Sequence, residues 1–496
     1  MKRECIEIWS DSFHEGDWCC SSLAQIALSN GFSVKRNYVR GLQSHYVFSS
    51  GQTEIELLVF GSYKSWSPLP EKVKELIDWG KPDFVAYSAA QKSILFAVEE
   101  TAATPTGNQA MQRCERQYGS ARFHIPYWYL ISEFGIHRDG GIRRDSIWPS
   151  IAALKLSILH ETPCMVLHYS DINNPEDYER GSGVRLLFAS LFLILRNFAE
   201  GKPALDGLAP LLENQYKEML RFINSQWENI IDFLPSQALV NDPNTPRILS
   251  EIVTGNTADK KSIQDLLVWP LIKNVPSHVK SKWKGKNLLK FDPLCAKFEQ
   301  DIDKGYAYYL SDNAGSGRPP ETAQIKKWIN KQKELFNRAK GLNPPASFTM
   351  DISDFPLTKN DGDRRHITTA KNIVYLYDSW NQLYESIVSA YPRLKGHLTK
   401  LQDDMPVFVY VSNSLKPGRL FGDPFTGQLS AYSIAFGRFD NPRRRVIVYF
   451  PHQVHTQVIS SRGAAVNKGM TLMTELTDYI IFHSGIAVNL STQEVM

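Results

Sequence analysis

The chain of 496 residues is poor in cysteine and has no long apolar run. None of its six cysteines forms a CxxC or CxxH pair, so neither a zinc finger nor a disulfide framework is expected, and a reducing cytoplasm fits them. They are Cys5, Cys19, Cys20, Cys114, Cys164 and Cys295. The first five residues include a glutamate and lack the apolar core of a signal peptide. The longest uncharged helical run, between Arg185 and Arg196, spans ten residues and predicts a buried helix, not a membrane span.

Charge excess and signature motifs are also scarce. The net charge is +4, which is compatible with nucleic acid but does not require it. Hydrophobic residues make up 43% and charged residues 22%, as in soluble globular proteins, and the length predicts about two to four domains. The sequence has neither a P-loop nor a G-x-S-x-G nucleophile elbow, so neither an ATP motor nor a Ser-His-Asp hydrolase is indicated.

What the sequence does have is a predicted β-hairpin with acidic residues near its ends. Residues 82–87 and 93–101 predict two strands that are joined by a turn at residues 88–92. Side chains alternate along a strand, so pairing about Ala90 gives the hairpin two distinct faces. One face then carries Asp83, Glu99 and Thr101, and the other carries Phe84, Ile94, Phe96 and Val98.

The two acidic residues on one face indicate a metal site. Two carboxylates held close together repel each other unless a cation lies between them, and Mg²⁺ is the natural candidate because it binds one or two carboxylates plus water and phosphate oxygens. Such an ion activates water and stabilises the leaving oxygen in phosphodiester hydrolysis. The alternative is a surface hairpin with ordinary acidic ends.

The segment after the hairpin carries a polar and cationic stripe. Pro105 and Gly107 end the strand and Asn108 can cap a helix. Four side chains on that helix follow the i, i+3, i+4, i+7 spacing and could face a phosphate, namely Gln109, Gln112, Arg113 and Arg116. A further apolar strand follows at residues 125–131, which completes the order helix, strand, strand, strand, helix, strand.

These residues resemble the PD-(D/E)xK nuclease superfamily, over roughly residues 10–135. Asp83 matches the motif aspartate, Glu99 matches the second acidic ligand, and the helix from Gln109 to Arg113 is similar to the Gln-rich helix of many members. Thr101 stands where the family's catalytic lysine is usual, which puts the role of that lysine in question. The resemblance implies that Asp83 and Glu99 bind Mg²⁺, with Thr101, Gln109 and Arg113 around the scissile phosphate.

An upstream acid often completes such sites in this family. Glu15, which opens the first predicted helix, is one candidate, and Glu54 and Glu56 on a predicted strand at residues 53–60 are two others. Glutamates on a half-exposed strand usually point to water, so solvent exposure alone could account for the two strand residues.

The predicted fold class is α/β, with a restriction-endonuclease-like domain of a mixed sheet and flanking helices at residues 1–177. A helical middle is expected at 178–310 and an α/β domain at 321–496, which contains strands at 406–411 and 446–450 and a last helix at about residues 468–480. Three basic clusters could contact phosphates, although such clusters are commonly solvated surface. The first consists of Lys280, Lys282, Lys284 and Lys286, and the third of Arg443, Arg444 and Arg445. The second lies on a predicted helix at residues 321–340 and consists of Lys326, Lys327, Lys331, Lys333, Arg338 and Lys340.

The sequence therefore predicts a cytoplasmic, Mg²⁺-dependent endonuclease that acts on double-stranded DNA as a homodimer, as in restriction or antiviral defence. Two alternatives stay open. The first is a DNA-binding or scaffold protein that keeps the nuclease fold without its activity, because the lysine is missing. The second is an RNase, although no aromatic motif specific to single-stranded RNA is present.

Overall fold

A computed structural model describes fifteen stretches of the chain, and every structural statement below refers to them. They are residues 5–39, 43–63, 69–101, 113–136, 142–145, 148–169, 182–225, 242–256, 373–377, 380–399, 407–411, 434, 445–450, 478–482 and 487–489. The chain divides into two compact units. The first contains residues 1–135, 144–224 and 238–265, and the second contains residues 136–143, 225–237 and 266–496.

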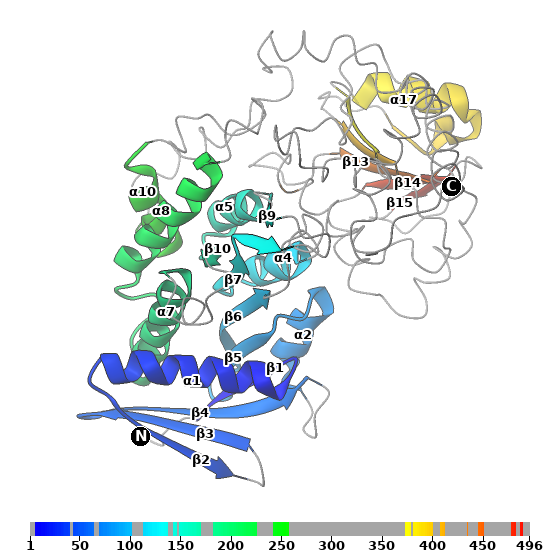
Figure 1. Cartoon of the computed structure of the whole chain (residues 1–496). Coiled ribbons are helices and arrows are strands. Elements are labelled where there is room, and N and C mark those ends of the chain that lie inside the picture. The colour runs from blue at the N-terminus through cyan, green and yellow to red at the C-terminus, as the bar shows by residue number, and fades with distance from the viewer. Residues whose placement is uncertain are drawn as a thin grey trace. The chain divides into compact units, whose positions relative to one another are not determined.

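The first unit is built on a mixed sheet of eight strands, in the order β10-β7-β6-β5-β1-β4-β3-β2 (Figure 1). β1 is parallel to β4, and both β6 and β10 are parallel to β7, whereas the other neighbours are antiparallel. The strands are β1 (Cys5–Ser10), β2 (Ser33–Val39), β3 (Gln43–Ser50), β4 (Thr53–Ser62), β5 (Phe84–Ser88), β6 (Ser93–Thr101), β7 (Tyr127–Ser132) and β10 (Cys164–Tyr169). A separate two-stranded ladder joins β8 (Phe134–Ile136) to β9 (Ile142–Arg144). The predicted α/β class with helices around a mixed sheet is confirmed.

Two helices cover one face of the sheet. α1 (Phe13–Ser29) begins with a capping box between Ser12 and Glu15, and its buried side chains pack on β4 and β1. α7 (Ser182–Ala199) packs against α1, with Phe188 in edge contact with Trp18 and Phe192 with Phe32. This aromatic layer buries the face that carries Phe84 and Phe96, and burial of apolar surface is the main source of stability there.

Three shorter helices lie on the other side, namely α2 (Glu71–Trp79), α4 (Cys114–Arg122) and α5 (Trp148–His160). Two glycines let α2 and α4 approach closely. A Cβ atom at Gly119 would lie 2.5 Å from Cβ of Trp79, and one at Gly80 would lie 3.0 Å from the backbone nitrogen of Arg116. The close approach holds the first turn of α4 beside the sheet.

The predicted hairpin is present, but its centre is one residue further along than expected. β5 begins at Phe84, which pairs with Val98, so Asp83 directly precedes the strand and stands opposite Glu99. The predicted shared face of Asp83, Glu99 and Thr101 follows from this register. A bulge after Ala86 shifts the pairing, so that Ile94 pairs with Tyr87. The prediction that Ile94 shares the face of Phe84 is therefore wrong, because one extra residue in a strand reverses the alternation.

The helices of the expected middle region belong to the first unit. α7, α8 (Ala209–Ser225) and α10 (Thr245–Val253) fall within it, and α7 packs on β10 and β4. α8 is tied to the sheet by the Trp128 indole, which donates to Gln215 Oε1 at 2.8 Å. Residues 178–181, 226–241 and 257–310 of the expected middle region lie outside the described residues.

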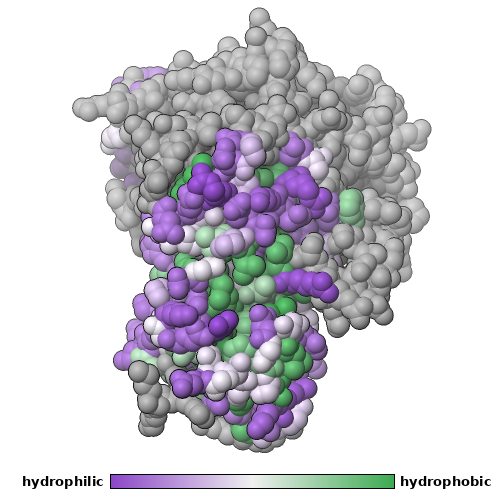
Figure 2. Space-filling model, turned by 90° about the vertical axis from the view of Figure 1, so that its left-hand side faces the viewer, coloured by the Kyte–Doolittle hydropathy of each residue, from purple (hydrophilic) through white to green (hydrophobic). Residues whose placement is uncertain are grey.

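On the side shown in Figure 2, hydrophilic residues dominate the described surface, with apolar areas between them. No helix among the described residues has the length and apolar character that crossing a membrane requires.

The second unit contains a five-stranded sheet in the order β11-β12-β13-β14-β15. Its strands are β11 (Ile373–Tyr377), β12 (Val407–Val411), β13 (Arg445–Phe450), β14 (Tyr479–Phe482) and β15 (Ala487–Asn489), and α17 (Trp380–Ala390) and the 3₁₀ helix η6 (Pro392–Gly396) accompany them. The expected last helix at residues 468–480 is wrong at its end, because Tyr479 and Ile480 pair with β13. Consecutive aromatic and β-branched residues fit a buried parallel strand better than a helix.

Candidate active site

The acidic residues of the hairpin meet at the point where β5 begins and β6 ends. Glu99 is fully buried, and Asp83 is half-buried at the start of its strand. The backbone N–H of Glu100 donates to Oδ2 of Asp83 at 2.5 Å, and the N–H of Asp11 donates to the carbonyl oxygen of Asp83 at 2.8 Å. Asp83 is thus fixed between the end of β6 and the end of β1.

The protonation of Asp83 reflects this crowding. Burial raises the pKa of its carboxyl well above the usual range, and the negative charges of Glu99 and Glu15 raise it further. The hydrogen bond from Glu100 and the charge of Arg116 act in the opposite direction without cancelling the rise. The ionised form of Asp83 is therefore energetically unfavourable here unless a cation binds beside it.

Glu99 already has cationic partners. Arg113 Nε lies 2.6 Å from Oε1 of Glu99, and Arg116 contacts the same oxygen through Nη1. Burial nevertheless raises the pKa of Glu99, and Glu15 adds to this, while both arginines lower it. The other oxygen, Oε2, is buried and accepts no hydrogen bond from the described residues.

Arg116 is the more enclosed of the two arginines. Burial lowers the pKa of its guanidinium, but the negative charges of Glu99 and Asp83 outweigh burial and hold the pKa above its ordinary value. Arg116 is therefore a permanent cation at this site. Tyr127 from β7 lies close by, since burial and the charge of Glu99 raise the pKa of its phenol.

The first helix contributes a third carboxylate. Glu15 lies in the first turn of α1, where its side chain accepts from the backbone N–H of Ser12 at 2.7 Å. Its negative charge adds to the rise in the pKa of both Asp83 and Glu99. Lys81 Nζ, 3.9 Å from an oxygen of Asp11, adds a cation at the same edge.

Of the three candidates for an upstream acid, only Glu15 is among the main charges that raise the pKa of Asp83 and Glu99. Glu54 and Glu56 lie on β4, where Glu54 accepts from Ser49 and Glu56 pairs with His45. Neither contributes to the pKa shifts of Asp83 or Glu99.

Thr101 occupies the same face as Glu99 but is already engaged. It is buried, its hydroxyl accepts from the phenol of Tyr129 at 3.4 Å, and its carbonyl oxygen accepts from Tyr169 at 3.3 Å. A neutral hydroxyl supplies no positive charge at this position. The guanidinium groups of Arg113 and Arg116 supply that charge at Glu99 instead.

Asp83 and the buried Oε2 of Glu99 offer carboxylate oxygens, the kind of ligand that Mg²⁺ prefers. Among the described residues, Asp83, Glu99 and Glu15 do not form a group whose ligand atoms all lie within 4.8 Å of one another. A cation between Asp83 and Glu99 would offset burial, which is the main cause of the raised pKa of Asp83, and also the charge of Glu99.

Several expected site residues lie outside the described residues. These are Gln109, Lys280, Lys282, Lys284, Lys286, Arg443 and Arg444, and Arg445 is described only through its backbone at the start of β13. α4 begins at Cys114 with Arg113 as its N-cap, and residues 102–112 before it are not described.

Sequence reasoning did not assign a catalytic role to Arg116, although the polar stripe included it. The available signal was its spacing of three residues from Arg113, because residues at i and i+3 lie on one side of a helix. What the spacing could not show is that this side faces Glu99. That contact depends on where α4 packs against the sheet.

Comparisons of the chain with protein families, curated proteins and solved structures gave no match.

Proposed function

We propose that this protein is a metal-dependent endonuclease of the PD-(D/E)xK type that hydrolyses phosphodiester bonds of double-stranded DNA, as restriction and antiviral defence enzymes do. The observation that carries the proposal is that Asp83 and Glu99 stand opposite each other across the β5–β6 hairpin, with two arginines at Glu99. Acids and bases that are crowded together with perturbed pKa values are typical of catalytic sites.

Asp83 and Glu99 would hold Mg²⁺. When bound, the ion supplies a Lewis acid that lowers the pKa of water and neutralises charge on the phosphate. The side chains around the ion would hold the carboxylates and the phosphate in place. Arg113 is partly exposed and aims a guanidinium at Glu99, so it can bind a phosphate oxygen from the same place.

Arg116 has a different role in this proposal. It is held by Glu99 and packs beside Gly80, so it keeps the carboxylate oriented and offsets part of the negative charge at the site. Thr101, whose hydroxyl is bonded to Tyr129, closes the base of the site and takes no part in proton transfer. Gln109 and the basic clusters near residues 280–286 and 443–445 stay candidates for DNA contact.

One active site per chain cuts one strand at a time. A double-strand break therefore calls for two copies, and we propose a homodimer on DNA. A monomeric mass of the DNA-bound protein in analytical ultracentrifugation would contradict this part of the proposal.

The test is cleavage of supercoiled plasmid by the full chain in Mg²⁺. We expect Asp83→Asn and Glu99→Gln to lower the cleavage rate by at least about a hundredfold, as does the loss of a group that stabilises transition-state charge. Glu54→Gln, a carboxylate on β4 away from the site, should cleave like the intact protein. Equal rates for all four proteins would refute the site assignment.

A second function is favoured by one specific observation. Glu99 is already neutralised by Arg113 and Arg116, which is how a buried acid is stabilised in a protein that binds no metal. A nuclease fold that binds DNA without cutting it would show no cleavage in Mg²⁺ but would retain DNA binding in a gel-shift assay. Labelled RNA in the same reaction tests the RNase alternative.

A further inference from the structure

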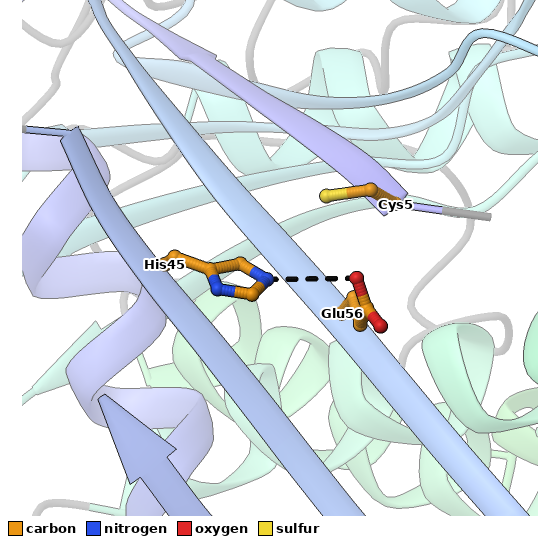
Figure 3. Close-up of side chains that lie close together, drawn as sticks. All are labelled: Cys5, His45 and Glu56. Carbon is orange, nitrogen blue, oxygen red and sulfur yellow. Dashed lines mark ion pairs between the residues drawn. The ribbon is translucent and has the colours of Figure 1, made fainter. Parts of the chain in front are cut away.

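A second group of potential metal ligands lies on the same sheet, away from the proposed nuclease site. It consists of Cys5 on β1, His45 on β3 and Glu56 on β4. The potential ligand atoms of all three side chains lie within 4.8 Å of one another, and the nearest ring nitrogen of His45 is 3.5 Å from an oxygen of Glu56. In Figure 3 the His45 ring faces the Glu56 carboxylate, and Cys5 lies beside them.

The sheet topology explains why these residues meet. β4 lies between β1 and β3. Cys5 on β1 is the direct register partner of Glu56 on β4. His45 on β3 pairs with Leu58, two residues from Glu56, and is therefore its diagonal neighbour. The neighbours Ile6, Ile55 and Tyr46 point into the core, so the alternation turns the three ligand residues to the opposite, half-exposed face. The meeting is thus fixed by backbone pairing.

The group is separate from the carboxylates of the hairpin. Cys5 opens β1, and Asp11, which bonds to Asp83, follows the end of that strand. Six residues at about 3.3 Å each place the two sites about 20 Å apart along the strand. Neither Cys5 nor His45 contributes to the pKa shifts of Asp83 or Glu99.

We propose that Cys5, His45 and Glu56 bind a divalent transition metal, and Zn²⁺ in particular. Sulfur, imidazole nitrogen and carboxylate oxygen together are ligands of zinc, whereas Mg²⁺ selects oxygen alone. At zinc-to-ligand distances of 2.0–2.3 Å, neighbouring ligand atoms of a tetrahedral site lie about 3.4–3.7 Å apart. The 3.5 Å between His45 and Glu56 already meets this value, and the 4.8 Å limit leaves a shift of about 1 Å for Cys5.

The three residues leave one position of the metal open. Each is only half-buried, so water or an external ligand can occupy that fourth position. A nucleophilic role for the cysteine fits less well, because activated thiols lie in electropositive surroundings and Cys5 has Glu56 and Glu7 on its own face. The metal also joins three strands, so it would stabilise this end of the sheet.

Cobalt(II) tests the site because it occupies zinc sites and absorbs light when bound to thiolate. The tag-free full chain, freed of metal by chelator, should bind about one Co²⁺ with a sulfur-to-metal charge-transfer band that Zn²⁺ abolishes. Cys5→Ser should lose this band. His45→Ala and Glu56→Gln should weaken Co²⁺ binding by at least about tenfold, since even the partners behind metal ligands contribute that much.

Three controls separate this metal site from the nuclease site and from nonspecific binding of the ion. Glu54→Gln lies on the same strand and should bind Co²⁺ as the intact protein does, as should Asp83→Asn in the proposed nuclease site. Thermal unfolding of metal-free Cys5→Ser should match that of the metal-free intact chain, and only the latter should gain stability from Zn²⁺. A charge-transfer band that persists in Cys5→Ser, or its absence in the intact chain at excess Co²⁺, would overturn the proposal.

Discussion

At the scale of single residues, the balance between Glu99 and its two arginines decides the character of the proposed nuclease site. Removing one partner of a buried ion pair destabilises a folded protein by about 3–5 kcal/mol. The contacts with Arg113 and Arg116 therefore stabilise the fully buried carboxylate of Glu99. Among the described residues, no cation forms an ion pair with Asp83 as the two arginines do with Glu99. The aspartate's hydrogen bond from Glu100 and the charge of Arg116 do not offset burial and the charge of Glu99.

This imbalance predicts how stability depends on pH. The pKa of Asp83 is raised on folding, so the folded chain binds the proton more tightly than the unfolded chain does. The resulting stabilisation is complete below the unfolded pKa of about 3.9 and is lost as pH rises through the folded pKa. Without divalent ions, Asp83→Asn should therefore be more stable than the intact chain at neutral pH, and the difference should shrink in acid.

Thermal unfolding across pH measures this effect. Addition of Mg²⁺ should raise the melting temperature of the intact chain at neutral pH and leave that of Asp83→Asn nearly unchanged, because ligand binding to the folded state stabilises it. An Asp83→Asn protein that is less stable than the intact chain at neutral pH would show that the carboxylate is satisfied without a metal.

At the scale of elements, the contact between α2 and α4 places the arginines. Gly119 packs against Trp79, and Gly80 packs against the start of α4 at Arg116. Trp79 also stacks at an angle on Tyr118 and lies under the guanidinium of Arg122. The position of α4, and with it that of Arg113, thus depends on two residues without side chains.

Gly119→Ala tests this dependence. The added methyl would lie 2.5 Å from Cβ of Trp79, so the helices must separate, and we expect a loss of about 1–3 kcal/mol in the free energy of unfolding. Lys74→Ala, on the exposed side of α2, is the control and should stay within about 0.5 kcal/mol. Chemical denaturation measures the free energy of unfolding of both variants. Equal stability of the two variants would mean that α2 and α4 can separate at Gly119 without loss of stability.

At the scale of the whole molecule, the first unit extends beyond residues 1–177, the boundary that the sequence predicts for the first domain. α7 fills the face of the sheet opposite the candidate active site, and its buried side chains include Leu187, Phe188, Leu191, Phe192, Ile194 and Leu195. Burial of each such side chain contributes about 1.5–3 kcal/mol, so exposing all of them would cost about as much as the usual net stability of about 5–15 kcal/mol.

Two fragments distinguish the extent of this unit. A fragment of residues 1–177 lacks α7 and exposes an apolar sheet face, so we expect it to aggregate or to melt without cooperativity. A fragment of residues 1–265 keeps α7, α8 and α10 and should unfold in one transition. Circular dichroism and size-exclusion chromatography give the comparison, and a soluble, cooperative 1–177 fragment would restore the domain boundary that the sequence predicts.

The sequence by itself determined the local features. Alternation along β5 and β6 was enough to place Asp83, Glu99 and Thr101 on one face, and the apolar runs were enough to find β4, β7 and α7 near their observed limits. These are properties of neighbouring residues, because the period of a strand or a helix is set by backbone geometry. The alternation gave the wrong face for Ile94, because a bulge shifts the pairing of β5 and β6 there.

Only the tertiary structure decided which distant residues meet. Glu15 reaches the hairpin because β1 pairs with β5, and Arg116 reaches Glu99 because α2 and α4 pack through two glycines. Cys5, His45 and Glu56 meet because β4 lies between β1 and β3. Strand order and helix placement arise because whole apolar faces of the sheet and helices are buried against one another. The free energy of that burial depends on several segments together, so the residue spacing within one segment does not reveal it.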